Sequence, residues 1–217
     1  MSTQILSTDL YLGQARASFS VQHCMAIYDK WAATYNHEVG NEAQNYVAPV
    51  LVAQAALASA EDPAKCVILD AGCGTGLVGQ ALALAGAKVI DGLDLSPAML
   101  KVAKQTGVYR NLAQADLTRR IDTADETYDM VTCVGTFTLG HVGPRPALSE
   151  FVRITRRHGI VAASILEEIW VSGGFKAEVE RLEAEGRVTV VTQELIDYVK
   201  GHGDRAVLVI LQKLNSA

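Results

Sequence analysis

Short apolar runs alternate with amphipathic stretches along the chain from Lys65 onward. Apolar runs of about four to eight residues are typical of buried strands, whereas apolar residues spaced by three and four indicate helices. The pattern predicts strands at 66–69, 88–93, 130–134, 160–165, 188–191 and 206–211, and one ending at Ala113. It predicts helices at 76–85, from 97 onward, at 146–157 and at 175–185. Such alternation indicates an α/β sandwich around a mostly parallel sheet, in which the last two strands are expected to pair.

Capping residues sharpen some of these boundaries. Gly86 is expected to end the helix at 76–85, and Gly159 the helix at 146–157. Ser96 and Pro97 predict an N-cap and a first helical position. Tyr128, just before the strand at 130–134, is expected to be exposed.

The first 62 residues lack this alternation. Residues 1–20 are small and polar, and helices are expected at about 21–35 and 43–60. Pro49 falls near the first turn of the second helix, where proline is tolerated. We therefore expect a single domain, with an N-terminal helical lid over 1–62 and an α/β core over 63–217.

Ligands of such sheets bind beyond the carboxyl ends of the strands. The chemistry is therefore expected directly after four positions, which are Leu69, Leu93, Ala113 and Val134.

A glycine-rich loop follows the first of these strands. Gly74, Gly76 and Gly79 match G-x-G-x-x-G, so a nicotinamide or flavin enzyme is one alternative. Asp70 stands directly before the loop, where its carboxylate would repel a pyrophosphate. It would instead attract the α-ammonium group of S-adenosylmethionine (SAM), directly or through water. Gly72, Gly74 and Gly76 would let the backbone approach the methionyl part and the ribose.

Two more carboxylates follow the next strands. Asp94 is placed to accept two hydrogen bonds from ribose hydroxyls, which suits NAD as well as SAM; Asp91 is the weaker candidate. Asp116 is placed to accept from an adenine amino group, with the Leu117 N–H meeting a ring nitrogen. Met99 is placed either to pack on the adenine face or to fill the core.

Taken together, four segments resemble the class I SAM-dependent methyltransferases. They are V-I-L-D-A-G-C-G-T-G (67–76), D-G-L-D-L-S-P-A-M-L (91–100), Q-A-D-L (114–117) and Y-D-M-V-T-C-V-G-T-F-T (128–138). The resemblance implies a Rossmann-like, three-layer sandwich with a seven-stranded, mostly parallel sheet and one antiparallel edge strand. It implies SAM as the cofactor and S-adenosylhomocysteine (SAH) as the product.

Within this class the chain resembles the Williams–Beuren syndrome region methyltransferase-like subgroup. The resemblance rests on Y-D-K-W-A-A-T-Y (28–35), G-T-F-T-L-G-H-V (135–142), Trp170 and Gly174-Phe175. It places a helix over the cofactor, with three aromatic side chains on one face that suit a sulfonium cation. The cofactor-binding residues it implies are Tyr28, Trp31, Tyr35, Asp70, Gly72, Gly74, Gly76, Asp94, Leu95, Met99, Asp116, Leu117 and Val134.

The expected reaction moves the methyl group of SAM to an O, N or C atom of a small organic acceptor. His141 is the candidate base, because its pKa suits neutral pH; a structural role is the alternative. Thr136, Phe137 and Thr138 predict an apolar acceptor pocket with hydroxyl donors. Two other functions stay open: a SAM-binding enzyme that catalyses a cyclisation or rearrangement, and a non-catalytic interaction protein.

The composition of the chain limits the classes of partner that we expect. The net charge of −5 argues against a nucleic-acid partner, and the basic run at 153–158 is expected in the last turn of a helix. The four cysteines form no C-x-x-C pair and no metal site is expected; Cys66 and Cys133 predict buried thiols. Without a signal peptide or an apolar run of about 20 residues, we expect a cytoplasmic protein, monomeric or homodimeric, with no membrane partner.

Overall fold

The computed structural model describes residues 14, 25–27, 30–35, 38, 45–139 and 142–215, apart from the side chain of His202. Its strands are β1 (Val67–Ala71), β2 (Val89–Asp94), β3 (Asn111–Gln114), β4 (Tyr128–Phe137), β5 (Thr155–Leu166), β6 (Val188–Val199) and β7 (Asp204–Lys213). Its helices are α4 (Ala48–Leu57), α5 (Leu77–Leu84), α6 (Pro97–Gln105), α7 (Ala147–Ile154), α8 (Glu167–Trp170), α9 (Phe175–Ala184) and the short 3-10 helix η1 (Lys200–His202).

The seven strands form one sheet in the order β3-β2-β1-β4-β5-β7-β6. Neighbours from β3 to β5 are parallel, while β7 runs antiparallel to both β5 and β6. The predicted seven-stranded, mostly parallel sheet is therefore confirmed, with the reversed strand β7 lying beside the edge strand β6. Because β2 and β4 lie on opposite sides of β1, the chain reverses its strand order there. Ligand sites form at such a switch point.

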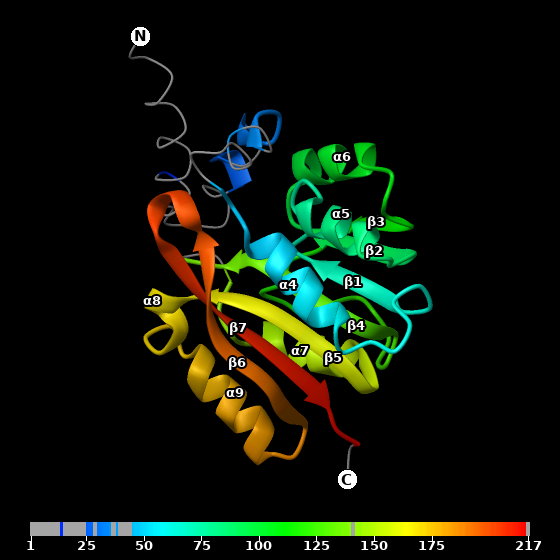
Figure 1. Ribbon diagram of the computed structural model, residues 1–217, viewed down its shortest axis with the longest axis vertical. Coiled ribbons are helices and arrows are strands. Elements are labelled where there is room, and N and C mark those ends of the chain that lie inside the picture. Colours follow the sequence, from blue (N-terminus) through cyan, green and yellow to red (C-terminus); the bar gives the residue numbers. More distant parts are fainter. Residues whose placement is uncertain are drawn as a thin grey trace.

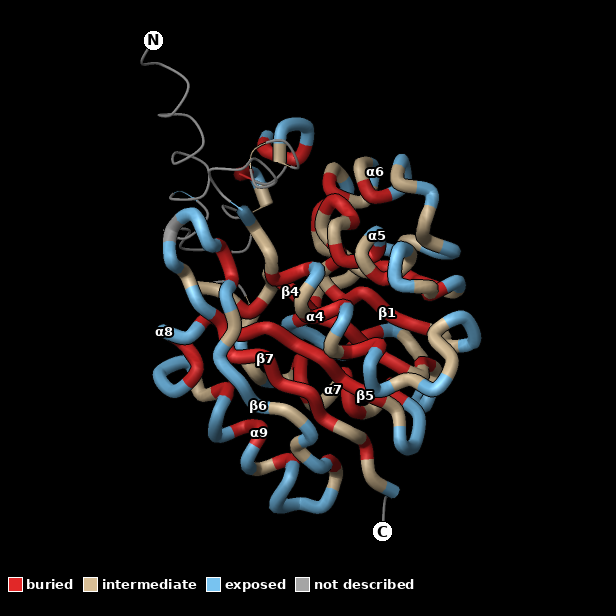
Figure 2. Tube along the Cα trace, in the orientation of Figure 1, coloured by how far each residue is buried: buried red, intermediate tan, exposed pale blue. Residues whose placement is uncertain are grey.

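Helices cover both faces of the sheet, so the predicted three-layer sandwich is confirmed. Figure 1 shows α4 crossing in front of the sheet and α7 behind it. α4 contacts α5, β4 and β5, whereas α7 contacts α9 and β5. Figure 2 shows the buried positions concentrated along the central strands.

The helix α4 belongs to the sandwich, although the sequence assigned its residues to the lid. Its buried residues include Ala48, Val52, Ala53 and Ala56, a helical spacing that faces the sheet. Pro49 lies in its first turn, as expected. The predicted helix at 43–60 is therefore present but shorter.

The predicted helix at 146–157 is wrong at its C-terminal end, because α7 stops at Ile154. The Thr155 hydroxyl donates to the Phe151 carbonyl at 2.7 Å, and Thr155 then pairs with Tyr128 at the start of β4. Tertiary strand pairing thus overrides the helical pattern. Gly159, expected to end the helix, lies inside β5.

Tyr128 is buried, which corrects the expectation that it is exposed. Its hydroxyl donates to Asp91 Oδ2 at 3.3 Å, so the phenol oxygen has a polar partner inside the protein. Arg110 holds the same carboxylate through Nε at 2.9 Å. Asp91 is therefore a structural group.

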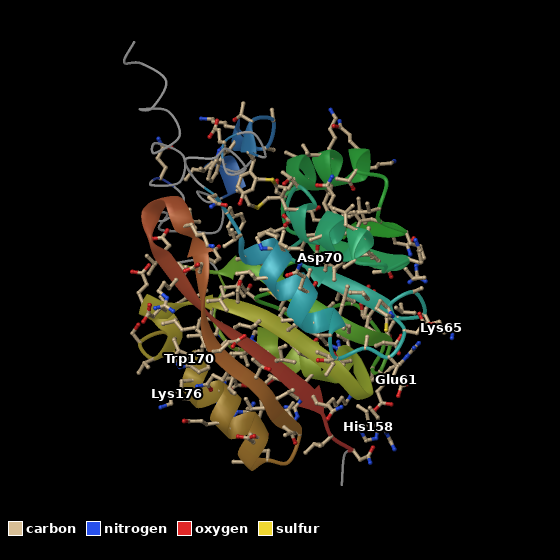
Figure 3. All side chains as sticks on the ribbon, viewed as in Figure 1. Glu61, Lys65, Asp70, His158, Trp170 and Lys176 are labelled. Atoms are coloured by element: carbon tan, nitrogen blue, oxygen red, sulfur yellow. The ribbon has the colours of Figure 1, made fainter. Side chains whose placement is uncertain are left out.

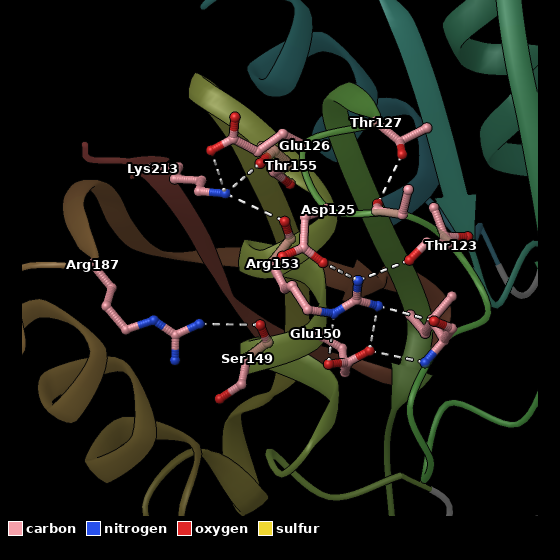
Figure 4. A network of polar contacts seen from close by, with 12 residues as sticks. Thr123, Asp125, Glu126, Thr127, Ser149, Glu150, Arg153, Thr155, Arg187 and Lys213 are labelled. Carbon is pink, nitrogen blue, oxygen red and sulfur yellow. Dashed lines mark hydrogen bonds and ion pairs between the residues drawn. The ribbon is translucent and has the colours of Figure 1, made fainter. Parts of the chain in front are cut away.

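The basic run at 153–158 divides between two elements. Arg153 lies in α7, but Arg156, Arg157 and His158 lie in β5, so the expectation that the run shares one helical turn is wrong. Arg153 pairs with Glu150 and Asp125 at 2.7 and 2.6 Å (Figure 4). These pairs fasten the loop before β4 to α7.

Candidate active site

The loop between β1 and α5 folds back onto the end of β2. Gly72, Gly74 and Gly76 have φ values of 74°, 53° and 98°, which only glycine adopts without strain. The Gly72 and Cys73 N–H groups both donate to the Leu93 carbonyl, at 2.7 and 2.9 Å. The loop is therefore fixed before any ligand binds.

Asp94 completes this attachment at the end of β2. Its Oδ2 accepts from the Gly74 N–H at 2.8 Å, and its Oδ1 accepts from the Ser96 N–H at 2.8 Å. Burial raises the pKa of Asp94, while these backbone donors lower it. Ser96 caps α6 by accepting from the Met99 N–H at 3.3 Å, so the predicted N-cap is confirmed.

A bulge bends the end of β4 toward this loop. The register of β4 against β5 shifts between Cys133 and Phe137, and Gly135 there has a φ of 81°. Bulges re-aim side chains at such places. The Thr136 hydroxyl consequently lies in the space that a Cβ on Gly72 would need.

One pocket joins the carboxyl ends of these strands. The predicted cofactor residues that line it are Tyr35, Gly72, Gly74, Asp94, Leu95, Met99, Asp116, Leu117 and Val134. The four positions at which the sequence placed the chemistry thus converge on one cavity.

Two of the residues that the sequence assigned to the adenine lie in the chain after β3. Asp116 and Leu117 both line the pocket, and Met99 is 3% exposed on the opposite element, α6. The Asp116 Oδ1 accepts from the Thr118 N–H at 2.9 Å, and Oδ2 pairs with Arg119 at 3.3 Å. These contacts orient the carboxylate at the pocket wall.

Three predicted cofactor residues do not line the pocket. Asp70 is fully buried; its Oδ2 accepts from the Tyr109 hydroxyl at 2.7 Å (Figure 3 marks its place). Gly76 forms the N-cap of α5. Trp31 is 2% exposed and donates from Nε1 to Glu38 at 2.5 Å. Its ring contacts Tyr35, 4.7 Å away between centroids, so these two rings share a face as the spacing predicts.

Tyr28 and His141 lie outside the described residues. Phe137 is fully buried against Phe151 and Phe175, so its predicted place in the acceptor pocket is wrong. Thr136 does line the pocket. Strand alternation explains the difference, since neighbouring side chains point to opposite faces of β4. Of the predicted buried thiols, Cys133 is buried and Cys66 only partly so.

The sequence interpretation missed a tyrosine pair at the pocket mouth. Tyr46 lines the pocket, and its hydroxyl donates to the Tyr198 hydroxyl at 3.3 Å. The Val47 N–H donates to the Tyr198 carbonyl at 3.1 Å, which ties the segment before α4 to the end of β6. The two tyrosines lie 152 positions apart, and no local pattern indicates such a contact.

The described ranges hold neither a metal-binding cluster nor a membrane-spanning helix. No group of three or more His, Cys, Asp and Glu side chains there is arranged to hold a metal ion. No helix there has the length and apolar character needed to cross a membrane.

The comparisons with known proteins agree with this geometry. A sequence profile described as a methyltransferase domain matches residues 68–159. Human Methyltransferase-like protein 27, of the Williams–Beuren region, is 31% identical over 164 residues, or 73% of this chain and 65% of that protein. The malonyl-[acyl-carrier protein] O-methyltransferase of Yersinia pestis is 39% identical over 103 residues, or 47% of this chain and 37% of that protein. The match therefore spans less than two thirds of either relative.

Solved structures share the fold at lower identity. The [4+2]-cyclase SpnF gives a TM-score of 0.68 at 15% identity, covering 90% of this chain and 97% of that one. A putative methyltransferase, solved in complex with the Haloferax volcanii Trm112 activator, gives a TM-score of 0.64 at 18% identity. The match covers 87% of this chain and 98% of that chain. Profile, relatives and fold agree with the glycine loop and its flanking carboxylates: residues 68–159 match a methyltransferase domain, and the chain resembles the class I SAM-dependent methyltransferases, an enzyme family whose cofactor is S-adenosylmethionine.

Proposed function

We propose that this protein transfers the methyl group of SAM to an O, N or C atom of a small organic acceptor. One observation carries the proposal: a single pocket is lined by Asp116 and Met99, by Asp94 and Gly72, and by Gly135 and Thr136, and the carboxyl ends of the strands that bring them there follow one another across the sheet in the order β3-β2-β1-β4. This order matches the adenine, ribose and methionyl parts of the cofactor, followed by space for a second molecule.

Each part of the cofactor has a candidate partner in that pocket. We assign the ribose hydroxyls to Asp94, whose carboxylate keeps acceptor capacity beyond its backbone donors. We assign the adenine to Asp116, Leu117 and Met99. Tyr35 lines the same pocket, and its aromatic ring would suit the sulfonium cation.

The acceptor end supports a small, weakly polar substrate. Its described walls are formed by Tyr35, Tyr46, Gly135, Thr136 and Val142. These groups offer apolar contact together with hydroxyl donors and acceptors. An oxygen acceptor gains support because the Yersinia relative is named an O-methyltransferase.

The chemistry demands orientation more than activation. Bound SAM supplies an electrophilic methyl group with a good leaving group. The protein then has to hold the acceptor atom in line with that methyl group, which by itself can contribute much of the rate. Where the acceptor must lose a proton, we assign His141 as the base.

A non-methylating reaction is the second candidate. One comparison favours it: the structure of SpnF, a [4+2]-cyclase, matches this fold over 97% of the SpnF chain. In that case the cofactor would bind but keep its methyl group.

Two measurements separate the possibilities. Isothermal titration calorimetry of the purified chain with SAH should show binding, and absence of binding would contradict both candidates. Incubation with methyl-labelled SAM and a fractionated metabolite extract should then give labelled small molecules. Binding without transfer would favour the non-methylating alternative.

The assembly and the location belong to the same proposal. We expect a cytoplasmic monomer or homodimer that acts without nucleic acid or membrane. Light scattering after size-exclusion chromatography measures the molar mass of the assembly, which distinguishes a monomer from a dimer.

A further inference from the structure

The ring of Tyr109, in the segment between α6 and β3, fills a slot made by three glycines. A Cβ on Gly79, in α5, would overlap its Cζ and hydroxyl oxygen. A Cβ on Gly92, in β2, would lie 3.0 Å from its Cε1, and one on Gly76 would lie 3.1 Å from its Cε2. Glycine at position 79 is therefore needed for the ring to pass between β2 and the start of α5, and glycine at 76 and 92 leaves room on its edges.

At the end of this slot the ring reaches β1. The Tyr109 hydroxyl donates to Asp70 Oδ2 at 2.7 Å, and the Thr132 hydroxyl approaches Asp70 Oδ1 at 3.4 Å. Asp70 is fully buried and stands two residues before Gly72, where the cofactor loop begins. A buried carboxylate without donors would be costly, so its donors fix where this part of the loop can lie.

We infer that Tyr109 is a positioning residue for SAM, which holds the glycine loop in its binding conformation by hydrogen bonding to the Asp70 carboxylate. The inference rests on the SAM cofactor of the family and is independent of the acceptor. It also explains why glycine stands at position 79. The third glycine of the apparent dinucleotide fingerprint makes room for a tyrosine ring.

The charge on Asp70 makes this arrangement sensitive to pH. The pKa of Asp70 is raised to about 7, chiefly by burial and also by the nearby Asp94, against the hydrogen bonds from Tyr109, Thr132 and the Gly79 backbone, which lower it. The other titratable groups that interact with Asp70 in the described part of the chain are the Cys73 and Cys133 thiols, whose pKa values burial raises. The carboxylate form of Asp70 is therefore favoured mainly by its hydroxyl and backbone donors.

The experiment measures SAH affinity by calorimetry between pH 6 and pH 8. If the carboxylate form is the binding-competent one, wild-type affinity falls about tenfold from pH 8 to pH 6, in proportion to the competent fraction. Tyr109→Phe keeps the ring and removes the donor. It should weaken binding several-fold at pH 7 and move the loss of affinity to higher pH, because the Asp70 pKa rises further.

Tyr128→Phe is the matched control. It also removes a tyrosine hydroxyl from a buried aspartate, Asp91, but neither residue lines the pocket. It should leave SAH affinity and its pH dependence unchanged. Asp70→Asn supplies a second variant, which should bind SAH weakly and without pH dependence near 7.

Two results would overturn the inference. One is that Tyr109→Phe binds SAH like the wild type at every pH. The other is that it weakens binding by the same factor throughout, as a purely structural loss would. Failure of the wild type to bind SAH at all would instead count against the cofactor assignment, so the two failures are distinguishable.

Discussion

The hydroxyl of Thr136 occupies the space that a Cβ on Gly72 would need, so β4 and the glycine-rich loop after β1 meet directly. We predict that Gly72→Ala destabilises the loop through two separate effects, backbone strain and overpacking. A side chain at a φ of 74° costs about 1–3 kcal/mol, and overpacking against Thr136 costs a similar amount. Urea unfolding should show the loss of stability, and calorimetry should show weaker SAH binding.

Thr136→Ala in the Gly72→Ala background provides the control. Removing the hydroxyl relieves the overlap but leaves the backbone strain, so about half of the lost stability should return. If the two substitutions instead add independently, the contact between these residues is not what limits Gly72.

We predict that Asp94→Asn weakens SAH binding roughly tenfold to a hundredfold. The amide has one acceptor oxygen where the carboxylate has two, so either Gly74 or Ser96 loses its acceptor, and the ribose loses a charged partner. Hydrogen bonds to charged groups contribute about 1.5–3 kcal/mol, and about 1.4 kcal/mol is a factor of ten. Asp122→Asn, on an exposed side chain outside the pocket, removes the same charge and should bind SAH normally.

Features encoded by neighbouring residues could be predicted from the sequence. The alternation of strands and helices, the cap at Ser96 and the turn at Gly72–Gly76 each depend on residues within one or two turns. The parallel sheet then requires Asp94 and Asp116 to meet at one edge, and both line the pocket. Local pattern and sheet topology together therefore predicted many of the residues that line the pocket.

Features that depend on distant contacts could not be predicted. The pairing of Thr155 with Tyr128 turned an expected helix end into a strand. At the bulge near Gly135, Thr136 lines the pocket as predicted, but Phe137, predicted to line it too, is buried in the core. Asp70 faces Tyr109, 39 positions away, because three glycines open a slot between them. None of these contacts leaves a periodic signal along the chain.

For His141, once an acceptor is known, we predict that His141→Gln lowers kcat by about 10²–10⁴, the usual contribution of a general base. SAH affinity should stay at the wild-type value, because the assigned role concerns the acceptor proton. The acidic limb of the pH–rate profile should be absent in this variant, because no imidazole remains to be protonated. An unchanged kcat would show that orientation alone carries the transfer.

Ser164 lowers the stability of the fold, because its hydroxyl is buried without a hydrogen-bond partner in the described ranges. Its Oγ, in the middle of β5, is the one buried side-chain polar atom there without a hydrogen-bond partner. Burying such a group costs about 1–3 kcal/mol. Ser164→Ala should therefore raise the free energy of unfolding by about 1 kcal/mol, seen as a higher Tm. A lower Tm would mean that the hydroxyl has a partner after all.

Glu178 joins α9 to α7 through a buried ion-pair cluster. It is 1% exposed and accepts from Arg145, from Ser149 at 3.0 Å and from Arg181 at 2.6 Å. Burial alone would raise the pKa of Glu178, but the hydrogen bonds from Arg181, Arg145 and Ser149 lower it to about 2. The carboxylate form is therefore favoured by folding.

The sign of the resulting pH dependence follows from that lowered pKa. The contribution of Glu178 to stability is fully present above its unfolded pKa of about 4.5 and is lost as pH falls toward 2. A shift of this size corresponds to about 3 kcal/mol. Glu178→Gln should lose about that much stability at pH 7 and flatten the unfolding free energy between pH 5 and pH 3, because no carboxylate remains there to protonate. An acid profile as steep as that of the wild type would mean that other carboxylates dominate acid unfolding.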